Sequence, residues 1–248
     1  MGLNRSYRSI MIGTVAQSGN VPTMYNPICC FDASDTSPSN ITQASGFVSL
    51  WKNRSGTGYD FFQNSSGGQP QTGTITINSL NGFNFAVADF MSLGNVPATP
   101  DLTIMAVFKP LSNNDGTASF LSADAANNDF QIDAVFANQF RGRINATGLG
   151  ETSNPAFGTD QRDNIIQATY RFSANESNVK VRLNGTQTQL GTYNGLMSPT
   201  LLYKIATNRA QNRSQLMHLG ELLIFNDDLN NTQMDTIETY LMDKWGIA

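Results

Sequence analysis

Acidic residues and the single histidine are the side chains of this chain that could support hydrolysis. Asp129 and Asp133 stand four positions apart in an apolar run and would share one face of a strand. At the usual rise of a strand the two carboxylates would lie about 13 Å apart, whereas a retaining glycosidase needs a separation of about 5 Å. His218 could act as the base of a Ser-His-Asp triad, but the sequence has no G-x-S-x-G motif that would supply the nucleophile. The sequence therefore predicts a protein without catalytic residues.

Aromatic side chains beside polar turns could instead bind a sugar, because an aromatic ring offers an apolar face next to hydrogen-bonding groups. Tyr59, Phe61 and Phe62 follow a turn rich in Gly and Ser, and Tyr193 precedes Asn194-Gly195. We expect these four aromatic residues to form a glycan-binding platform. The alternative is that they pack at the edges of the fold.

Metal and cofactor chemistry has few candidates. Cys29 and Cys30 are the only cysteines, and neighbouring residues of a strand point to opposite faces, so neither a disulfide nor a zinc site is expected. We interpret them as small hydrophobic residues at the start of a strand. No metal and no cofactor are predicted. Calcium is the alternative, because four oxygen-bearing side chains follow closely without EF-hand spacing: Asp124, Asn127, Asn128 and Asp129.

Charge and composition exclude two classes of partner. The formal net charge at pH 7 is −4, and the 15 Lys and Arg residues are scattered along the 248-residue chain. A nucleic-acid-binding surface needs clustered basic residues that displace counterions from phosphates. No run approaches the roughly 20 apolar residues of a membrane-spanning helix. We therefore expect neither nucleic acid nor a membrane as a partner.

Short β-branched and aromatic runs alternate with turn signals, which is typical of a sandwich or barrel. Leu102–Phe108 is apolar enough for a strand that is buried on both faces. Asn184-Gly185 predicts a tight hairpin, because both residues tolerate positive φ, and Asn81-Gly82 is interpreted in the same way. The other predicted strands are Thr74–Ile77, Phe83–Val87, Phe130–Phe136, Ile165–Phe172, Val179–Leu183 and Leu219–Phe225.

One segment has helical rather than strand spacing. Thr232–Trp245 is predicted to form an amphipathic helix that packs against the sandwich. Asn230 or Asn231 would cap its start, and Gly246 would end it. The apolar stripe of this helix consists of Met234, Ile237, Leu241 and Trp245.

Two segments near the C-terminus carry a specific motif. Gly220–Ile224 is a Gly-Glu-(apolar)₃ run, and Tyr240–Gly246 has the pattern Tyr-Leu-x-x-Lys-Trp-Gly. Together they resemble the closing strand and helix of laminin-G-like jelly-roll domains, which belong to the concanavalin A-like lectin and glucanase superfamily. Phe31–Asp35 and Trp51–Gly56 are similar to the first strand and the turn that follows it. The resemblance runs from about residue 31 to residue 246.

The resemblance implies an all-β fold, a two-sheet antiparallel jelly-roll sandwich with one short C-terminal helix. Glucanases of this superfamily carry Glu-x-Asp-x-x-Glu, and the nearest acidic run here, Asp129–Asp133, contains no Glu. The resemblance therefore implies a binding protein or a structural protein and not an enzyme. We expect Trp51 and Trp245 to anchor the core. We expect Glu221 to bond backbone amides of a loop.

The N-terminal segment differs from the rest of the chain. Residues 1–27 contain Pro22 and Pro27 and match nothing in the resemblance. We expect residues 1–27 to form an N-terminal arm or attachment segment and residues 28–248 to form the sandwich.

A role on a virus particle follows as the main functional hypothesis. The chain begins at Met1 without the apolar core of a signal peptide, and a bacteriophage protein leaves the cell by lysis. We expect a non-catalytic structural protein on the virion surface, as a capsid decoration or a tail or fibre component. Its partners would be other virion proteins, bound through residues 1–27, and a host cell-surface glycan. Particle symmetry would make it a homo-oligomer. The alternative is an extracellular bacterial carbohydrate-binding module.

Overall fold

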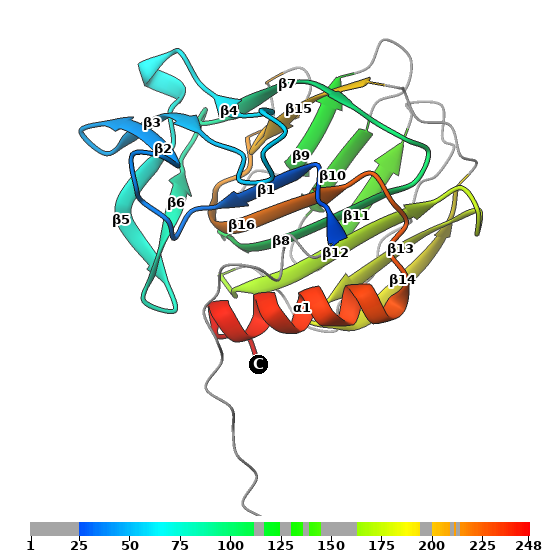
Figure 1. Ribbon diagram of the computed structural model, residues 1–248. Helices are drawn as coiled ribbons and strands as arrows, with labels where there is room; N and C mark the ends of the chain where they lie inside the picture. The colour runs from blue at the N-terminus through cyan, green and yellow to red at the C-terminus, as the bar shows by residue number, and fades with distance from the viewer. Residues whose placement is uncertain are drawn as a thin grey trace, which may run out of the picture.

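The structure, a computed structural model, describes residues 25–111, 117–124, 130–135, 139–144, 163–193, 200–208, 211 and 214–248. In these residues it has sixteen β-strands and one α-helix (Figure 1). The elements are β1 (Cys29–Asp32), β2 (Ile41–Ala44), β3 (Phe47–Trp51), β4 (Phe61–Phe62), η2 (Ser66–Gly68, a 3-10 turn), β5 (Gln71–Ile77), β6 (Leu80–Phe85), β7 (Met91–Pro97), β8 (Leu102–Pro110), β9 (Thr117–Asp124), β10 (Phe130–Val135), β11 (Gln139–Ile144), β12 (Ile166–Ser173), β13 (Asn178–Leu183), β14 (Thr186–Thr192), β15 (Thr200–Ile205), β16 (Met217–Phe225) and α1 (Asn231–Trp245).

The strands form two layers that are continuous at one point. The first sheet has the order β5-β6-β16-β8-β12-β13-β14, and β1 pairs with β16. The second sheet has the order β11-β10-β9-β15-β7-β4-β3, and β2 pairs with β3. The pair Phe47↔Gln71, between β3 and β5, joins the two sheets. The pairings of the described strands are antiparallel, which confirms the predicted all-β antiparallel sandwich.

Strand β8 separates two apolar clusters, as expected for a strand that is buried on both faces. Its residues Leu102, Ile104, Ala106 and Phe108 enter the main cluster between the sheets. Met105 and Val107 enter a second cluster between the first sheet and α1. Cys29 and Cys30 are divided in the same way and are both free thiols, which confirms their interpretation as buried hydrophobic residues.

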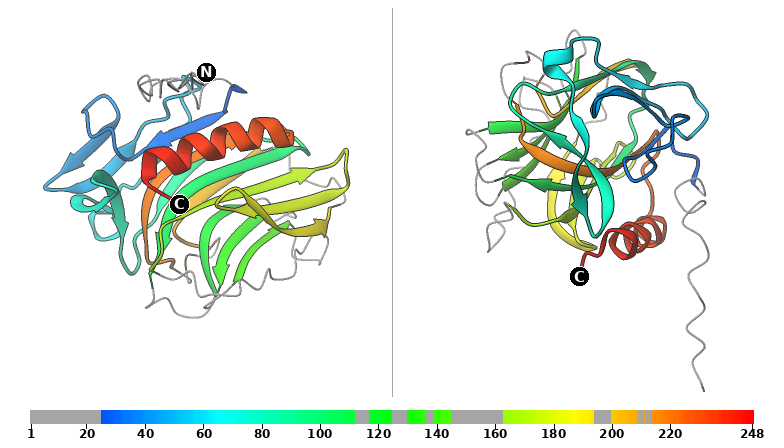
Figure 2. Two further views of the ribbon diagram at one scale, coloured as in Figure 1. Left: turned by 90° about the horizontal axis from the view of Figure 1, so that it is seen from below. Right: turned by 90° about the vertical axis from the view of Figure 1, so that its left-hand side faces the viewer.

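Helix α1 covers the outer face of the first sheet (Figure 2). Asn230 caps its start, because the Asn230 side chain accepts from Gln233 N at 3.1 Å and the Gln233 side chain accepts from Asn230 N at 2.8 Å. Gly246 ends the helix in the left-handed region at φ 66°. The predicted apolar stripe is buried, which confirms the helix and its orientation: Met234, Ile237, Leu241 and Trp245.

One of the two predicted hairpin turns is correct and the other is wrong. Asn184 and Gly185 have φ of 46° and 75°, as a tight turn between β13 and β14 requires. The turn between β5 and β6 instead uses Asn78 and Ser79, at φ 48° and 64°. Asn81-Gly82 lies inside β6, where a Cβ on Gly82 would be 2.6 Å from Ile75 Cδ1. Gly82 is therefore closely packed inside a strand and does not form a turn.

Packing against the sandwich extends a few residues before the predicted boundary at residue 28. Pro27 is buried, and Tyr25 packs against the cluster beneath α1. The remainder of the predicted arm, residues 1–24, lies outside the described residues. Within the described part of the chain, no helix is long and apolar enough to cross a bilayer.

Candidate functional site

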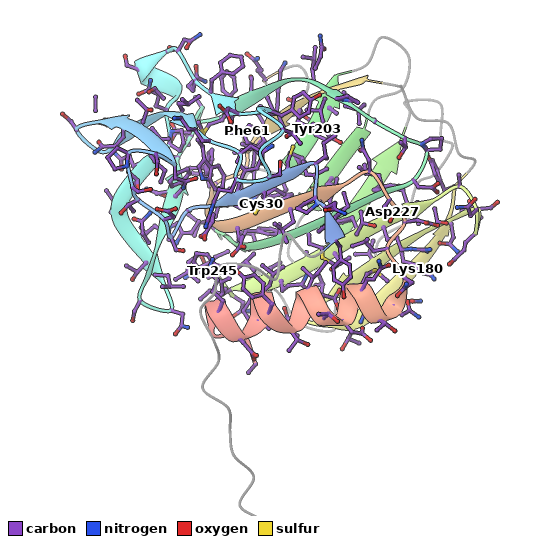
Figure 3. The ribbon with its side chains drawn as sticks, viewed as in Figure 1. Cys30, Phe61, Lys180, Tyr203, Asp227 and Trp245 are labelled. Atoms are coloured by element: carbon purple, nitrogen blue, oxygen red, sulfur yellow. The ribbon has the colours of Figure 1, made fainter. Side chains whose placement is uncertain are left out.

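Two of the four predicted platform residues lie inside the sandwich. Phe61 is fully buried, with its ring centroid 4.7 Å from that of Phe31 (Figure 3). Tyr193 is 2% exposed, and its hydroxyl donates to Pro100 O at 2.8 Å. A sugar cannot stack on a ring that both sheets enclose, so the structure corrects the expectation for these two residues.

The other two aromatic residues differ in exposure. Tyr59 is half-buried and packs against the main core cluster. Phe62 is 42% exposed and lies opposite Leu50 on β3 and Ser92 on β7. Phe62 therefore remains available to a ligand, on the outer face of the second sheet.

The predicted calcium ligands fall largely outside the described residues. Asp124 is the last residue of β9, while Asn127, Asn128 and Asp129 are not described. Among the residues that are described, no group of three or more His, Cys, Asp or Glu side chains gathers as a metal site would require. Calcium binding stays an alternative for the undescribed segment.

Glu221 belongs to a buried charge network, not to a loop. Its Oε2 accepts from Lys244 Nζ at 2.7 Å and from Trp245 Nε1 at 2.9 Å, both on α1. Lys244 Nζ also donates to Asp32 Oδ2 at 2.8 Å, and Arg54 Nη1 reaches the same oxygen at 2.8 Å. Burial raises the pKa of Glu221, and the Lys244 ammonium opposes that rise. The expectation that Glu221 bonds backbone amides is wrong, because α1 supplies its partners.

This network has a structural role in the molecule. The carboxylates of Asp32 and Glu221 share one ammonium, and both side chains are almost completely buried. The network joins β1, β16 and α1, which are the elements that carry the opening and closing motifs of the sequence. The two buried acids, held by Lys244 and by Arg54 on Asp32, stabilise the contact between helix and sheet, and neither carboxylate is open to a substrate.

Four polar side chains form a row across the outer face of the first sheet. Gln71 on β5 lies opposite Asn84 on β6. Asn84 lies opposite His218 on β16, and His218 lies opposite Lys109 on β8. At the other end of the row, Phe47 lies opposite Gln71 and is 38% exposed. We call Gln71, Asn84, His218 and Lys109 the polar row.

The alternation of the strands places the polar row on the outer face. Residues directly opposite each other in an antiparallel pair share a face, and successive residues of one strand alternate between faces. Sequence neighbours of Asn84, His218 and Lys109 enter the main core cluster, and Gln71 shares the face of Asn84, which lies opposite it. These neighbours are Phe83, Phe85, Phe108, Met217 and Leu219. The row therefore lies on the outer face of the first sheet, the same face that α1 covers over neighbouring residues. It lies beside the C-terminal end of α1, because Trp245 packs on Gly220, two residues after His218.

The polar row has unused hydrogen-bonding capacity. Each of its four side chains is half-buried, and none has a hydrogen bond or an ion pair to any residue in the described ranges. On β12 and β13 the outer polar side chains behave differently, since Thr169 bonds Glu238 and Arg182 pairs with Asp235. Successive strands are about 4.8 Å apart, so the row is about 14 Å long.

The electrostatics of the row centre on His218. Burial lowers the pKa of His218 from its usual value near 6.5, the Lys109 ammonium lowers it further, and Asp163 opposes the shift. The imidazole is therefore neutral at pH 7, with one nitrogen as a donor and the other as an acceptor. Lys109 is the cationic group of the row, and the row itself contains no carboxylate.

Sequence reasoning missed the polar row. Only His218 was singled out, as the one histidine, and it was considered as a catalytic base. Gln71, Asn84 and Lys109 carry no motif and are far apart in the chain. The three strand registers bring them together, and no local pattern encodes those registers.

No family model matches the chain, and no curated protein matches its sequence. Its fold is nevertheless similar to solved structures. Domain 4 of AbnA, a GH43 extracellular arabinanase from Geobacillus stearothermophilus solved in complex with arabinotriose, has a TM-score of 0.65 at 11% identity, covering 86% of this chain and 98% of that domain. The binding domain of Paraclostridial Mosquitocidal Protein 1 has a TM-score of 0.61 at 13% identity, covering 88% and 53%.

A third similar structure is an enzyme of greater length. Trypanosoma rangeli sialidase has a TM-score of 0.57 at 12% identity, covering 87% of this chain, and this chain spans 32% of the sialidase. At these identities the likeness shows a shared β-sandwich fold. The fold agrees with the resemblance to jelly-roll domains seen in the sequence.

Proposed function

We propose that the protein is a non-catalytic carbohydrate-binding domain whose ligand lies along the polar row. The observation that carries this proposal is the row itself: four half-buried polar side chains on adjacent strands, without partners among the described residues. Half-buried polar groups lose part of their hydration, and a ligand with matching donors and acceptors restores those hydrogen bonds.

The chemistry of the row suits a sugar. The side-chain amides of Gln71 and Asn84 each offer donors and an acceptor, as does the neutral imidazole of His218, and sugar hydroxyls both donate and accept. Phe47 offers an exposed ring at one end for the apolar face of a sugar. A row of about 14 Å suits a short oligosaccharide better than a single sugar. The similar arabinanase domain, which was solved with arabinotriose, supports the same class of ligand.

A binding role without catalysis also suits the described acids. Glycoside hydrolysis requires two carboxyl groups on either side of the scissile bond. Among the described residues, Asp163 is the one acid that acts on His218. Asp32 and Glu221 lie close together, but Lys244 pairs with both beneath α1 and Arg54 pairs with Asp32.

The location on a virus particle, the attachment through residues 1–27 and the oligomeric state remain predictions from the sequence. The attachment segment falls mostly in residues 1–24, outside the described residues, and the oligomer and the capsid or tail location rest on the sequence alone. Both the virion hypothesis and its alternative, a carbohydrate-binding module, include binding of a glycan. The likeness to a domain solved with an oligosaccharide favours that alternative.

A glycan array followed by calorimetry on the best ligand tests the proposal. Asn84→Ala removes an amide at the middle of the row, and we expect about tenfold weaker binding from the loss of one or two hydrogen bonds. Asn95→Ala is the matched control, because Asn95 is an exposed amide on β7 of the second sheet. Phe62→Ala tests the other exposed face. If Phe62→Ala weakens binding and Asn84→Ala does not, or if no glycan binds, the polar row is not the site.

A further inference from the structure

The two ends of the polar row differ in charge. The end at β3 and β5 carries Phe47 and Gln71, which are uncharged. The end at β16 and β8 carries His218 and Lys109. The Lys109 ammonium forms no ion pair within the described part of the chain. By contrast, Lys180 pairs with Glu176, and Lys244 is held by two carboxylates.

Among the described charged groups, Lys109 acts most strongly on the His218 ring. Lys109 lies opposite His218 on β8, and Asp163, in the segment before β12, acts on the ring through its charge. The neighbour on β6 is Asn84, which has no charge. Lys109 influences the ring more strongly than Asp163 does, so the nearby acid does not cancel the ammonium. An anion beside the ring would meet net attraction together with free donors from the amide and the ammonium.

We infer that the Lys109 end of the polar row binds the carboxylate of an acidic sugar, a uronate or a sialate, within the bound glycan. This inference rests on the proposed function. A carboxylate accepts several hydrogen bonds at once, and Lys109 supplies the charge while Asn84 and His218 supply directed donors. The neutral part of the glycan then extends across Gln71 towards the ring of Phe47.

Proton uptake on binding is a second consequence of the same geometry. A carboxylate next to His218 favours the imidazolium form, so the bound state holds a proton more tightly than the free state. Affinity for the acidic glycan therefore rises as the pH falls through the titration range of His218 in the complex. A neutral glycan brings no charge to the ring, and its affinity lacks this dependence.

Matched ligands test the inference with the full chain. Oligogalacturonate is compared with its methyl ester, and sialyllactose with its methyl ester, so each pair differs in one charge per esterified group. We expect one acid to bind about tenfold more tightly than its ester. The acid that shows this preference identifies the source of the carboxylate. Equal affinity for acid and ester in both pairs overturns the inference.

Variants separate the inference from the proposed function. Lys109→Met removes the charge and keeps the length of the side chain, and we expect it to abolish the preference for acid over ester. Lys52→Met is the control, because Lys52 is half-buried on the turn after β3, away from the row. If Lys109→Met keeps the preference, the inference fails. If acids and esters bind equally and Asn84→Ala weakens the binding of each, the proposed function stands and the inference about the carboxylate fails. If no glycan of either kind binds, the proposed function and the inference both fail.

Discussion

The indole of Trp245 lies against the backbone of Gly220 so closely that a Cβ atom at position 220 would be 3.0 Å from three ring carbons. This contact joins the two halves of the closing motif, the strand β16 and the end of α1. A real Cβ would have to displace a fully buried indole, which is fixed by its hydrogen bond to Glu221.

Gly220→Ala is therefore expected to destabilise the protein by about 1–3 kcal/mol, the usual cost of overpacking a core. Chemical denaturation followed by tryptophan fluorescence measures the change. Gly94→Ala is the matched control, since Gly94 lies in β7 and a Cβ there would have nothing within 4 Å. Equal stability of the two variants would show that the indole moves aside freely.

Lys244→Met should cost more than a surface lysine does. Its side chain is 9% exposed and holds Asp32 and Glu221, whose side chains are 7% and 1% exposed. Removing the ammonium leaves the buried Glu221 carboxylate without a cation and Asp32 with Arg54 as its remaining partner, and breaking a buried pair in this way typically costs about 3–5 kcal/mol. Thermal and urea unfolding measure the loss, with Lys52→Met as the control. A change below about 1 kcal/mol, the range of a surface ion pair, would contradict the buried network.

Glu238 on α1 links stability to pH. Its side chain is fully buried against Thr169 and Arg182, and burial raises its pKa from 4.5 to about 7, with both partners opposing the rise. The folded state thus holds the proton more tightly than the unfolded chain. Its contribution to stability is complete below pH 4.5 and is lost as the pH rises to about 7, by at most about 3 kcal/mol.

Glu238→Gln should remove this part of the pH dependence. The amide oxygen can still accept from the Thr169 hydroxyl, and no proton is exchanged on folding. Unfolding free energies measured from pH 4 to pH 8 should then differ from those of the native sequence by an amount that grows with pH. Asp243→Asn, at an exposed position of the same helix, is the control. Parallel curves for the native and Glu238→Gln proteins would refute the link.

Local signals explain what the sequence predicts well. Helix α1 follows from a capping residue, an apolar stripe and a terminal glycine within one short segment. The turn at Asn184-Gly185 needs only two residues that tolerate positive φ. The turn at Asn78-Ser79 has the same geometry without a glycine, which is why the neighbouring Asn81-Gly82 misled the prediction.

The candidate site depends on long-range pairing and was not predictable in the same way. Phe61 and Phe62 are adjacent, and only the pairing of β4 with β3 and β7 decides which ring faces the core. The polar row depends on three registers between strands that are distant in the chain. A register shift of one residue would turn each of its side chains inward.

Phe47 provides the last test of the site, because it lies at the uncharged end of the row, opposite Gln71. Phe47→Ala should weaken glycan binding about fivefold to tenfold through the loss of an aromatic contact of about 1 kcal/mol, while Phe47→Tyr should retain the affinity. Stability should change little, since the ring is 38% exposed. Titration calorimetry with Phe62→Ala as the control decides the outcome. If both alanine variants bind as the native protein does, neither ring contacts the sugar, and the ligand occupies only the polar part of the row.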